Sequence, residues 1–562
     1  MKKLISILLT FVLVFTSLSV IGVYAKEEGS LFMPSIFDDY MVLQRDRNVP
    51  VWGESTNEGA KVTVTLGEVS KETTVKNGKW YLELDPMPKA KDLTMTVTDT
   101  TSTLTYNNVA LGDVILLSGQ SNMAMELRKC YGYEYLITDS VNYDVRNYRQ
   151  TRKGSYQEER DNLDGNWIKI DGDTAGGVEA VGYVMAYQIS EKYDVAVGLV
   201  RVNLGGAAIE SYMDYEVLKA RPEYAKIISD FDKYKSGELA QNWKKAGSTL
   251  YNRMVHPLIP YACSSLVWYQ GCSNSGNPLL YNYQLYDYIN SWRESFRDPD
   301  MPVCVVQLAP YTSKYMELRQ VQADTSRRMK NVALITTANE GPKGYLNEEL
   351  IHPQEKIPVG NRTFYALDNM YYGASYEYTG PEYSYMTIEN DKPVLHFNHT
   401  GTDGLKIAKG DKLTGFTASK DGETFDTVEA VITDSDKIVI NMEGARYVRY
   451  GWVNMEKDGT LGGNLTNSSL VPAGPFKADL PSLNVDKCEI ADGKINVTLT
   501  NKGYSLTEAI VTVAKDGAEI KKETLVFETV DTESLVVDVE AGEYTVKITD
   551  PLGNVIAEKV LK

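Results

Sequence analysis

The chain contains 562 residues, of which 43% are hydrophobic and 24% are charged, so it can bury sizeable cores and is neither disordered nor collagen-like. At roughly 150 residues per domain, this length predicts three or four domains. The formal net charge of −18 argues against nucleic acid or an anionic membrane as a partner, because both would be bound against a repulsive field. The chain has four histidines and five cysteines but no HExxH or paired CxxC motif, which argues against a metal site built from those residues.

The first 25 residues have the features of a secretory signal peptide. Lys2 and Lys3 precede the apolar run ISILLTFVLVF, and Ala25 ends a sequence of the kind a signal peptidase cleaves. We therefore expect cleavage after residue 25 and a secreted protein without stable membrane insertion. An uncleaved membrane anchor is the alternative, because the apolar run is long enough to permit one. The odd number of cysteines leaves at least one unpaired, so disulfides are not expected to be the main source of stability.

The remaining chain divides into four regions by its hydrophobic pattern. Short alternating runs separated by Gly, Asn and Pro predict a small β-domain over 26–106. Over 107–372, compact apolar runs such as VILLSG and SSLVWYQG alternate with segments of helical spacing such as AVGYVMAYQISEKY. This pattern predicts an α/β/α domain, because a parallel sheet covered on both faces needs strands that are apolar along their whole length. Strand signals return over 373–481, which predicts a β-sandwich-like module, and the spacing over 482–562 predicts an immunoglobulin-like β-domain.

The segment VILLSGQSNM is the strongest candidate for chemistry. A buried strand is expected to run directly into Gly119 and Ser121, followed by the helix-compatible stretch MAMELRK. A serine there would expose its hydroxyl at the carboxyl edge of the sheet, near backbone N–H groups able to stabilise an oxyanion. Ser121 is therefore the candidate nucleophile. A helix N-cap without a catalytic role is the alternative, and Met123 stands where a GxSxG elbow would have its second glycine.

Three later segments supply possible partners for this serine. Asn203 is followed by Gly205 and Gly206 at the end of one predicted strand, and Asn274 follows another. His352 precedes a helix-like stretch, PVGNRTFYALDNMYYG. A histidine can take a proton from serine near neutral pH and later return it.

Taken together, these Ser, Gly, Asn and His blocks resemble the SGNH hydrolase superfamily, with an SGNH-type three-layer α/β/α domain that has a parallel sheet and is flanked by β-rich accessory domains. Within it, VILLSGQSNMAMEL, VNLGGAAIESYMD and IHPQEKIPVGNR are similar to the sialate O-acetylesterase family. The resemblance spans about residues 32–480. It implies an acetylated carbohydrate as substrate, no metal and no organic cofactor.

The resemblance also implies a role for each block. Ser121 would attack the acetyl carbonyl, and His352 would act as general base and then as general acid. The oxyanion would be held by the N–H of Ser121, an N–H of Gly205 or Gly206, and the side-chain amide of Asn274. Beside the motifs, Gln120, Gln270 and Trp268 are expected to contact the substrate. Tyr212 and Tyr269 are further aromatic residues on which a sugar ring could stack, although such rings also serve ordinary sheet packing.

Two positions depart from the family pattern. Superfamily relatives usually place an aspartate three residues before the histidine, and here that position is Glu349, with Glu348 beside it. Glu349 is the candidate third triad member, and a Ser-His dyad is the alternative. Cys272 replaces the acidic residue that many relatives carry in WYQGESN. It is an alternative nucleophile without an assigned base.

The leading hypothesis is a secreted carbohydrate O-acetylesterase that acts through an acetyl-enzyme on O-acetylated sialic acid. An acetylated plant polysaccharide such as xylan or xyloglucan is the alternative substrate. A sialate carboxylate would need a nearby cation, for which Arg128, Arg201 and Arg253 are candidates. The alternatives are a non-catalytic glycan-binding protein on the same fold and a lipase-like esterase. His256, His396 and His399 are expected to have structural roles, and the oligomeric state is left open.

Overall fold

The computed structural model describes residues 31–150, 156–240, 242–311, 315–338, 351–453, 462–480, 482–502, 507–527, 531–549 and 555–562. The predicted signal peptide lies outside these ranges. No helix in the described part of the chain is long and apolar enough to cross a membrane. All five cysteines are described and all have free thiols.

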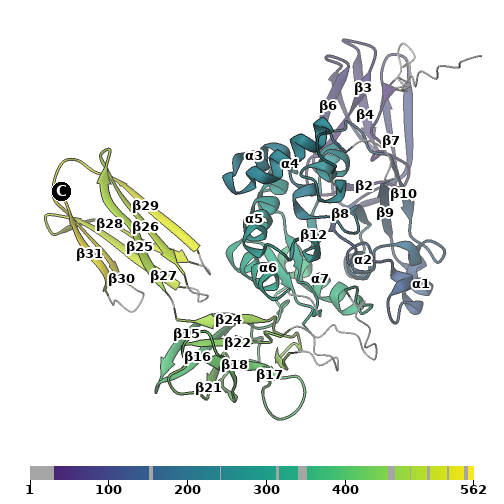
Figure 1. The fold of residues 1–562 in the computed structure, drawn as a ribbon. Helices are drawn as coiled ribbons and strands as arrows, with labels where there is room; N and C mark the ends of the chain where they lie inside the picture. The colour runs from purple at the N-terminus through teal and green to yellow at the C-terminus, as the bar shows by residue number, and fades with distance from the viewer. Residues whose placement is uncertain are drawn as a thin grey trace, which may run out of the picture.

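The amino-terminal region is built from short, mostly antiparallel strands, of which β2 and β7 pair with the long strand that enters the central sheet (Figure 1). Its strands are β1 (Leu31–Phe32), β2 (Val42–Gln44), β3 (Val49–Ser55), β4 (Lys61–Leu66), β5 (Val69–Thr74), β6 (Lys79–Leu84) and β7 (Ala90–Thr98). The next strand, β8 (Thr103–Gly119), first pairs antiparallel with β7 and then continues into the central sheet. The predicted boundary at residue 106 therefore falls within one continuous strand, and a single apolar core spans both regions.

The central region is a mixed α/β unit around one sheet, in which the strands run in the order β10-β9-β11-β8-β12-β13-β14. Its remaining strands are β9 (Val145–Gln150), β10 (Gly165–Lys169), β11 (Val197–Asn203), β12 (Ser265–Tyr269), β13 (Val303–Val306) and β14 (Val332–Ile335). Its helices are α1 (Glu134–Asp139), α2 (Ala180–Tyr193), α3 (Tyr215–Ala220), α4 (Ala225–Ser236), α5 (Pro278–Ser295), α6 (Met316–Arg328) and α7 (Ile357–Met370). Pairing is parallel from β9 through β14, whereas β10 is antiparallel to β9. The sheet is thus mixed rather than wholly parallel as predicted.

Helices cover both faces of this sheet, as the alternation of apolar runs predicted. One apolar core lies between the sheet and helices α2 and α7, and the other includes the inner face of α5. Side chains alternate between the two cores along β8, where Leu116 points to one and Leu117 to the other. Because β8 is central, every residue from Val109 to Gly119 is buried, which explains its continuous apolar run.

The register of the central strands brings three strand ends to one level. Gly119 at the end of β8 pairs with Asn203 of β11 on one side and with Tyr269 of β12 on the other. The segments that follow these strands therefore leave the sheet side by side at its carboxyl edge, where open α/β folds bind ligands.

Residues 382–479 form further β-structure with their own core. The strands are β15 (Glu382–Glu389), β16 (Lys392–Asn398), β17 (Leu405–Ile407), β18 (Phe416–Ser419), β19 (Asp426–Thr427), β20 (Ala430–Asp434), β21 (Lys437–Ile440), β22 (Tyr447–Tyr450), β23 (Leu465–Asn467) and β24 (Phe476–Asp479). Two four-stranded sheets, β15-β16-β21-β20 and β19-β18-β22-β24, enclose this core.

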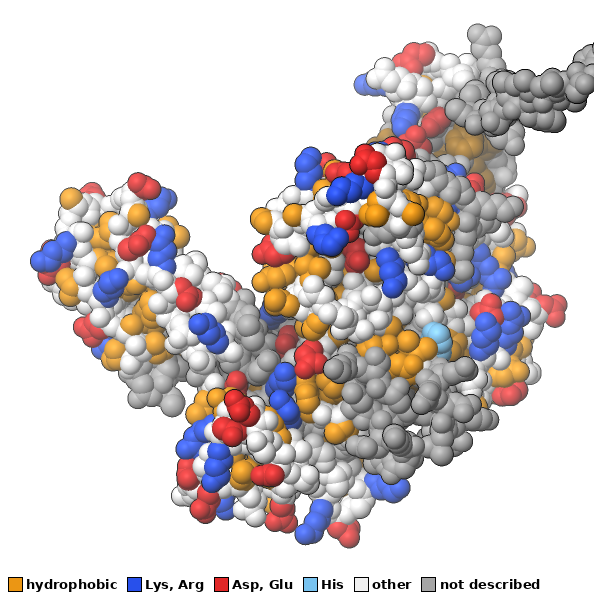
Figure 2. All heavy atoms as spheres, viewed as in Figure 1, with side chains coloured by type: hydrophobic (Ala, Val, Ile, Leu, Met, Phe, Trp, Pro, Cys, Tyr) orange, Lys and Arg blue, Asp and Glu red, His pale blue; other side chains and the backbone are white. Residues whose placement is uncertain are grey.

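The last region comprises sheets of three and four antiparallel strands around a separate core. Its strands are β25 (Leu483–Ala491), β26 (Lys494–Asn501), β27 (Thr507–Lys515), β28 (Ala518–Phe527), β29 (Asp531–Asp538), β30 (Tyr544–Thr549) and β31 (Val555–Leu561). This arrangement is typical of an immunoglobulin-like sandwich. Figure 2 shows acidic and basic side chains intermingled on the visible face of this region, which gives that face no single-sign patch.

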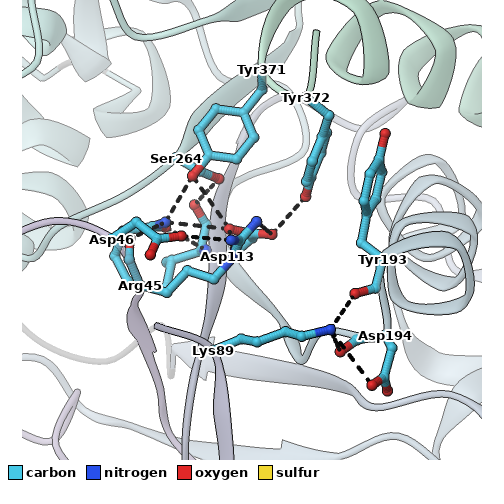
Figure 3. A network of polar contacts seen from close by, with 11 residues as sticks. Arg45, Asp46, Lys89, Asp113, Tyr193, Asp194, Ser264, Tyr371 and Tyr372 are labelled. Atoms are coloured by element: carbon cyan, nitrogen blue, oxygen red, sulfur yellow. Dashed lines mark hydrogen bonds and ion pairs between the residues drawn. The ribbon is translucent and has the colours of Figure 1, made fainter. Parts of the chain in front are cut away.

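A buried polar network fastens β8 at the edge of the sheet opposite Gly119 (Figure 3). The fully buried carboxylate of Asp113 accepts hydrogen bonds from Arg45 Nε at 3.0 Å and from the Tyr372 phenol at 2.6 Å. The Tyr371 phenol donates to the same carboxylate at 3.3 Å. One side chain thus joins the amino-terminal region, the central strand and the segment after α7.

We expect Asp113→Ala to lower the free energy of unfolding by about 3 kcal/mol, because it leaves Arg45 and two phenols without their shared acceptor. Chemical denaturation followed by fluorescence measures this change. Asp46→Ala is the matched control, because Asp46 pairs with the same arginine but its side chain is 57% exposed, so its loss is expected to cost under about 1 kcal/mol. Equal effects of the two substitutions would contradict a central role for Asp113.

Candidate active site

Ser121 lies on a sharp turn that only glycine permits at its start. Gly119 has φ +132°, and a Cβ atom there would lie 2.3 Å from the carbonyl oxygen of Tyr269. The same Tyr269 oxygen accepts a hydrogen bond from Gln120 N at 3.0 Å, and Tyr212 donates its phenol to the Gly119 carbonyl at 2.7 Å. The chain therefore turns directly off the central strand and leaves the half-buried Ser121 at the carboxyl edge.

The helix predicted directly after Ser121 is wrong. Residues 121–123 form a turn, closed by a hydrogen bond from Ala124 N to Gln120 O at 2.9 Å, and a single 3₁₀ turn follows at Leu127–Lys129. The intervening backbone instead bonds the segment before α2, with Leu127 N donating to Val178 O at 2.9 Å. This tertiary pairing overrides the helical propensity of MAMELRK.

His352 meets the serine across 231 positions of sequence. Its Nε2 lies 2.6 Å from Ser121 Oγ, the distance required of a base that removes the hydroxyl proton. Burial, and then the positive charge of Lys356, lower the pKa of His352 below its usual 6.5. The imidazole is therefore neutral, and able to accept that proton, at neutral pH.

Asn122 and Lys356 join the serine turn to the histidine segment, and sequence reasoning missed both. Asn122 Nδ2 donates to the Ile351 carbonyl at 2.8 Å, and its Oδ1 accepts from Lys356 Nζ at 2.7 Å. Asn122 and Lys356 are 3% and 1% exposed, so this clamp is shielded from competing water. It therefore holds His352 in place from both flanks. The signal in the sequence was weak: Asn122 directly follows Ser121, and Lys356 lies four residues after His352.

The predicted third member of the triad, Glu349, lies outside the described residues, as does Glu348. Glu349 therefore remains a prediction.

Three backbone N–H groups at Ser121 and the nearby glycines are candidate oxyanion donors. Gly205 is close enough to Ser121 that a Cβ on the glycine would contact the serine Cβ at 3.6 Å. Within the described residues, the N–H groups of Ser121, Gly205 and Gly206 donate to no protein acceptor, although their neighbours Gln120, Leu204 and Ala207 do. Free donors at this point suit an oxyanion.

The side chain of Asn274 is held in one orientation by its neighbours. Its Oδ1 accepts from Ile209 N at 3.1 Å and from Gln270 Nε2 at 2.7 Å, so its Nδ2 is identified as the donor end. That Nδ2 donates to Glu210 Oε2 at 2.8 Å, which uses one of its two hydrogens. Burial raises the pKa of Glu210, while hydrogen bonds from Asn274 and Gln284 oppose that rise. Glu210 is thus a positioning residue that sequence reasoning missed.

The sequence profile of a carbohydrate esterase family, the sialic acid-specific acetylesterases, matches residues 111–356. This range includes all the side chains and backbone donors assembled above. Residues 111–356 therefore resemble the catalytic region of a sialic acid-specific carbohydrate esterase. The chain is accordingly a carboxylic ester hydrolase, as predicted.

Relatives of known name support this assignment. Sialate O-acetylesterase from Mus musculus is 28% identical over 404 residues, which cover 60% of this chain and 73% of the mouse protein. The Rattus norvegicus sialate O-acetylesterase is 27% identical over 518 residues, covering 79% of this chain and 93% of the rat protein. The crystal structure of a carbohydrate acetylesterase from Xanthomonas citri superposes with a TM-score of 0.71 and 26% identity, covering 80% of this chain and all of that chain.

The three residues predicted to contact the substrate are buried in this esterase. Trp268 is fully buried and packs on Tyr288, with a ring distance of 4.3 Å, so it presents no face to a sugar. Gln270 is also fully buried and bonds Asn274, while Gln120 is 3% exposed and accepts from Gly271 N at 3.3 Å. The predicted substrate contact is therefore corrected: these side chains pack in the core or support loops. Their position at strand ends did not reveal that they turn inward.

Tyr212 and Tyr269 are likewise buried, with 0% and 1% exposure. Neither offers a stacking face, and both instead bond the serine turn.

Cys272 is a poor alternative to Ser121 as nucleophile. Burial raises the pKa of its thiol to about 11, although a hydrogen bond with Tyr315 opposes the rise. A thiol with this pKa is almost entirely protonated at neutral pH and is therefore unreactive.

The arginines considered for a substrate carboxylate already have acidic partners. Arg201 lies 2.8 Å from Glu179, Arg253 lies 3.4 Å from Asp164, and Arg128 pairs with Glu126 at 2.8 Å. Lys244 is a cation beside Gly205, because its Nζ donates to the Gly205 carbonyl at 3.1 Å. Sequence reasoning did not single it out.

The other histidines have partners away from Ser121. His256 Nε2 lies 3.2 Å from Glu159, and His399 Nδ1 lies 2.8 Å from Glu377. His396 is 8% exposed and bonds Thr387 at 3.0 Å. Structural roles for these three histidines therefore remain a prediction.

We expect Asn274→Ala to reduce kcat by about 10²- to 10³-fold, equivalent to about 3–4 kcal/mol of barrier, with little change in KM. The reason is that a donor to the oxyanion, the role predicted for Asn274, acts chiefly in the transition state. Steady-state kinetics on p-nitrophenyl acetate provides the measurement. Ser275→Ala changes the residue next to Asn274 and should leave kcat unchanged, so a comparable loss in this control would argue against a specific role for the amide.

Proposed function

We propose that this esterase removes O-acetyl groups from carbohydrate by serine catalysis, with Ser121 as nucleophile and His352 as base. The observation that carries the proposal is the 2.6 Å separation of His352 Nε2 and Ser121 Oγ. The free N–H groups at Ser121 and Gly205 supply the electrostatic stabilisation that an acyl transfer needs.

The reaction proceeds in two halves. Ser121 Oγ forms a bond to the acetyl carbon while its proton passes to His352 Nε2, and negative charge develops on the carbonyl oxygen. Collapse of this intermediate breaks the bond to the sugar oxygen, which takes the proton from His352, and leaves acetyl-Ser121. Water then repeats the sequence, giving up a proton to His352, and acetate and free Ser121 are released.

The fold of the central region and the third triad member are proposed from the family resemblance. The convergence of the Ser, Gly, Asn and His blocks supports an SGNH-type fold for the central region, and Glu349 is proposed to orient His352 Nδ1. The leader-like sequence of residues 1–25 supports secretion. The two carboxyl-terminal β-regions, 373–481 and 482–562, are proposed as accessory domains, because each has its own apolar core.

O-acetylated sialic acid is the proposed substrate, with Lys244 as the residue that attracts its carboxylate. The position of Lys244 Nζ against Gly205 supports this choice. An acetylated neutral polysaccharide is the second candidate, because the pairing of Arg128, Arg201 and Arg253 with carboxylates leaves fewer cations for an anionic sugar.

We expect Lys244→Met to raise KM for O-acetylated sialic acid by about tenfold or more, because a hydrogen bond to a charged group contributes about 1.5–3 kcal/mol. The same variant should hydrolyse p-nitrophenyl acetate and acetylated xylan as the wild type does. Acetate release on all three substrates makes the comparison, with the exposed Lys233→Met as control.

The outcomes separate the candidates. Turnover of acetylated xylan without turnover of O-acetylated sialic acid would show that the substrate is the polysaccharide. Glycan binding without acetate release from any of them would support a non-catalytic role and contradict the proposed function.

A further inference from the structure

Arg319 is a deeply buried arginine without a counter-ion in the described residues. It lies in the first turn of α6 and is 2% exposed. Its Nε and Nη2 have no hydrogen-bond partner, and the contact recorded for Nη1 is with the Met316 thioether sulfur at 3.8 Å. Leaving charged donors buried and unpaired costs several kcal/mol, so such a group is rare without a ligand.

The other buried arginines show how this protein normally compensates a guanidinium. Arg146 lies 2.8 Å from Asp144, and Arg253 lies 3.4 Å from Asp164. Arg293 donates to three backbone carbonyls, those of Met301, Lys330 and Asn331, at 2.8–3.2 Å. Arg319 has neither a carboxylate nor a set of carbonyls among the residues that the structure describes. Its environment is therefore exceptional within this chain.

A small cavity adjoins the Arg319 side chain. It has a volume of about 30 Å³ and lies where α6 meets β22 and the glycines Gly451, Gly462 and Gly463. Its described lining contains no aspartate or glutamate. A cavity of this size holds one water-sized solute, because about 10–15 Å³ suffices for a single water. This volume favours a small anion over a sugar-sized ligand.

The remaining polar group of the cavity also favours an anion. Tyr450 lines it, and the phenol oxygen accepts a hydrogen bond from Leu465 N at 2.8 Å, so the hydroxyl hydrogen is left to donate. Burial raises the pKa of Tyr450, which keeps the hydroxyl protonated. Burial also lowers the pKa of Arg319 to about 9, which reflects a cation without compensation. The position of Arg319 at the amino-terminal end of a 13-residue helix adds positive potential.

We propose that this cavity binds a single monatomic anion of the halide class, chloride in ordinary media, between the Arg319 guanidinium and the Tyr450 hydroxyl. Water would satisfy the donors but would leave the charge uncompensated. The bound anion would join α6 to the β-structure of residues 382–479. The proposal concerns stability and does not depend on the serine chemistry.

Thermal unfolding of the full chain tests the proposal. With sodium chloride replacing sodium gluconate at constant ionic strength, we expect the wild-type Tm to rise by about 3 °C and to saturate. Arg319→Met should remove this chloride-dependent rise, whereas Arg446→Met, which replaces an exposed arginine, should retain it. An equal rise in Arg319→Met, or no chloride-specific rise in the wild type, would overturn the proposal.

Bromide provides a second measurement on the wild-type protein, which covers the case in which Arg319→Met does not fold. We expect one anomalous scattering peak in the Arg319 cavity of a bromide-soaked crystal. Arg319→Lys, which keeps the charge, should keep a weaker chloride response. Electron density for water alone, without anomalous signal, would overturn the proposal while leaving the esterase mechanism untouched.

Discussion

Ser121→Ala is expected to lower kcat on p-nitrophenyl acetate by about 10⁴- to 10⁶-fold. The substitution removes the atom proposed to attack the acetyl carbon, and the Cys272 thiol, whose pKa is raised to about 11, is not expected to replace it. Residual hydrolysis would come from the remaining oxyanion donors. Initial rates at saturating substrate provide the measurement.

Ser273→Ala is the matched control for this loss. Ser273 supplies only its backbone N–H, which donates to Gln120 Oε1 at 3.3 Å and is retained by alanine. Both variants should unfold at the wild-type temperature. Retention of more than about a hundredth of the wild-type kcat in folded Ser121→Ala would rule out this serine as the nucleophile.

His352→Ala is expected to reduce kcat by a comparable factor, because the serine then lacks the base that lies 2.6 Å from its hydroxyl. The loss should not add to that of Ser121→Ala, since the two residues act in one proton transfer. Kinetics of both single variants and the double variant provide the test, and additive losses would contradict a shared step.

The pH dependence of the wild type gives an independent check on His352. In the proposed mechanism the neutral form of His352 is the active base, so kcat/KM should fall as pH drops through a pKa below 6.5. Lys356→Met removes a cation that disfavours imidazolium, so the pKa of His352 should rise and the acid limb should move to higher pH. Because Lys356 also bonds Asn122, kcat is expected to decrease as well. An acid limb that stays in place would show that Lys356 acts on the histidine through geometry alone.

Local signals in the sequence predicted individual elements well. The helix expected over 180–193 is α2 (Ala180–Tyr193), and the helix-like stretch after His352 is α7 (Ile357–Met370). Apolar periodicity is sufficient there, because each helix presents one face to a core that the sheet supplies. The same reasoning failed for MAMELRK, whose backbone bonds the segment before α2 rather than itself.

The sequence alone determined the catalytic candidates Ser121, His352, Gly205 and Asn274, because strand-end glycines and polar side chains are local features with a recognisable order. Only the tertiary structure decided which neighbouring side chains face inward. Gln120, Gln270 and Trp268 are buried, whereas Asn122, Glu210 and Lys356 support the reacting groups. The physical reason is that a hydrogen bond between residues far apart in the chain, such as Asn122 and Lys356, leaves no periodicity in either segment. The meeting of these distant segments follows from the register of three strands that end at one edge of the sheet.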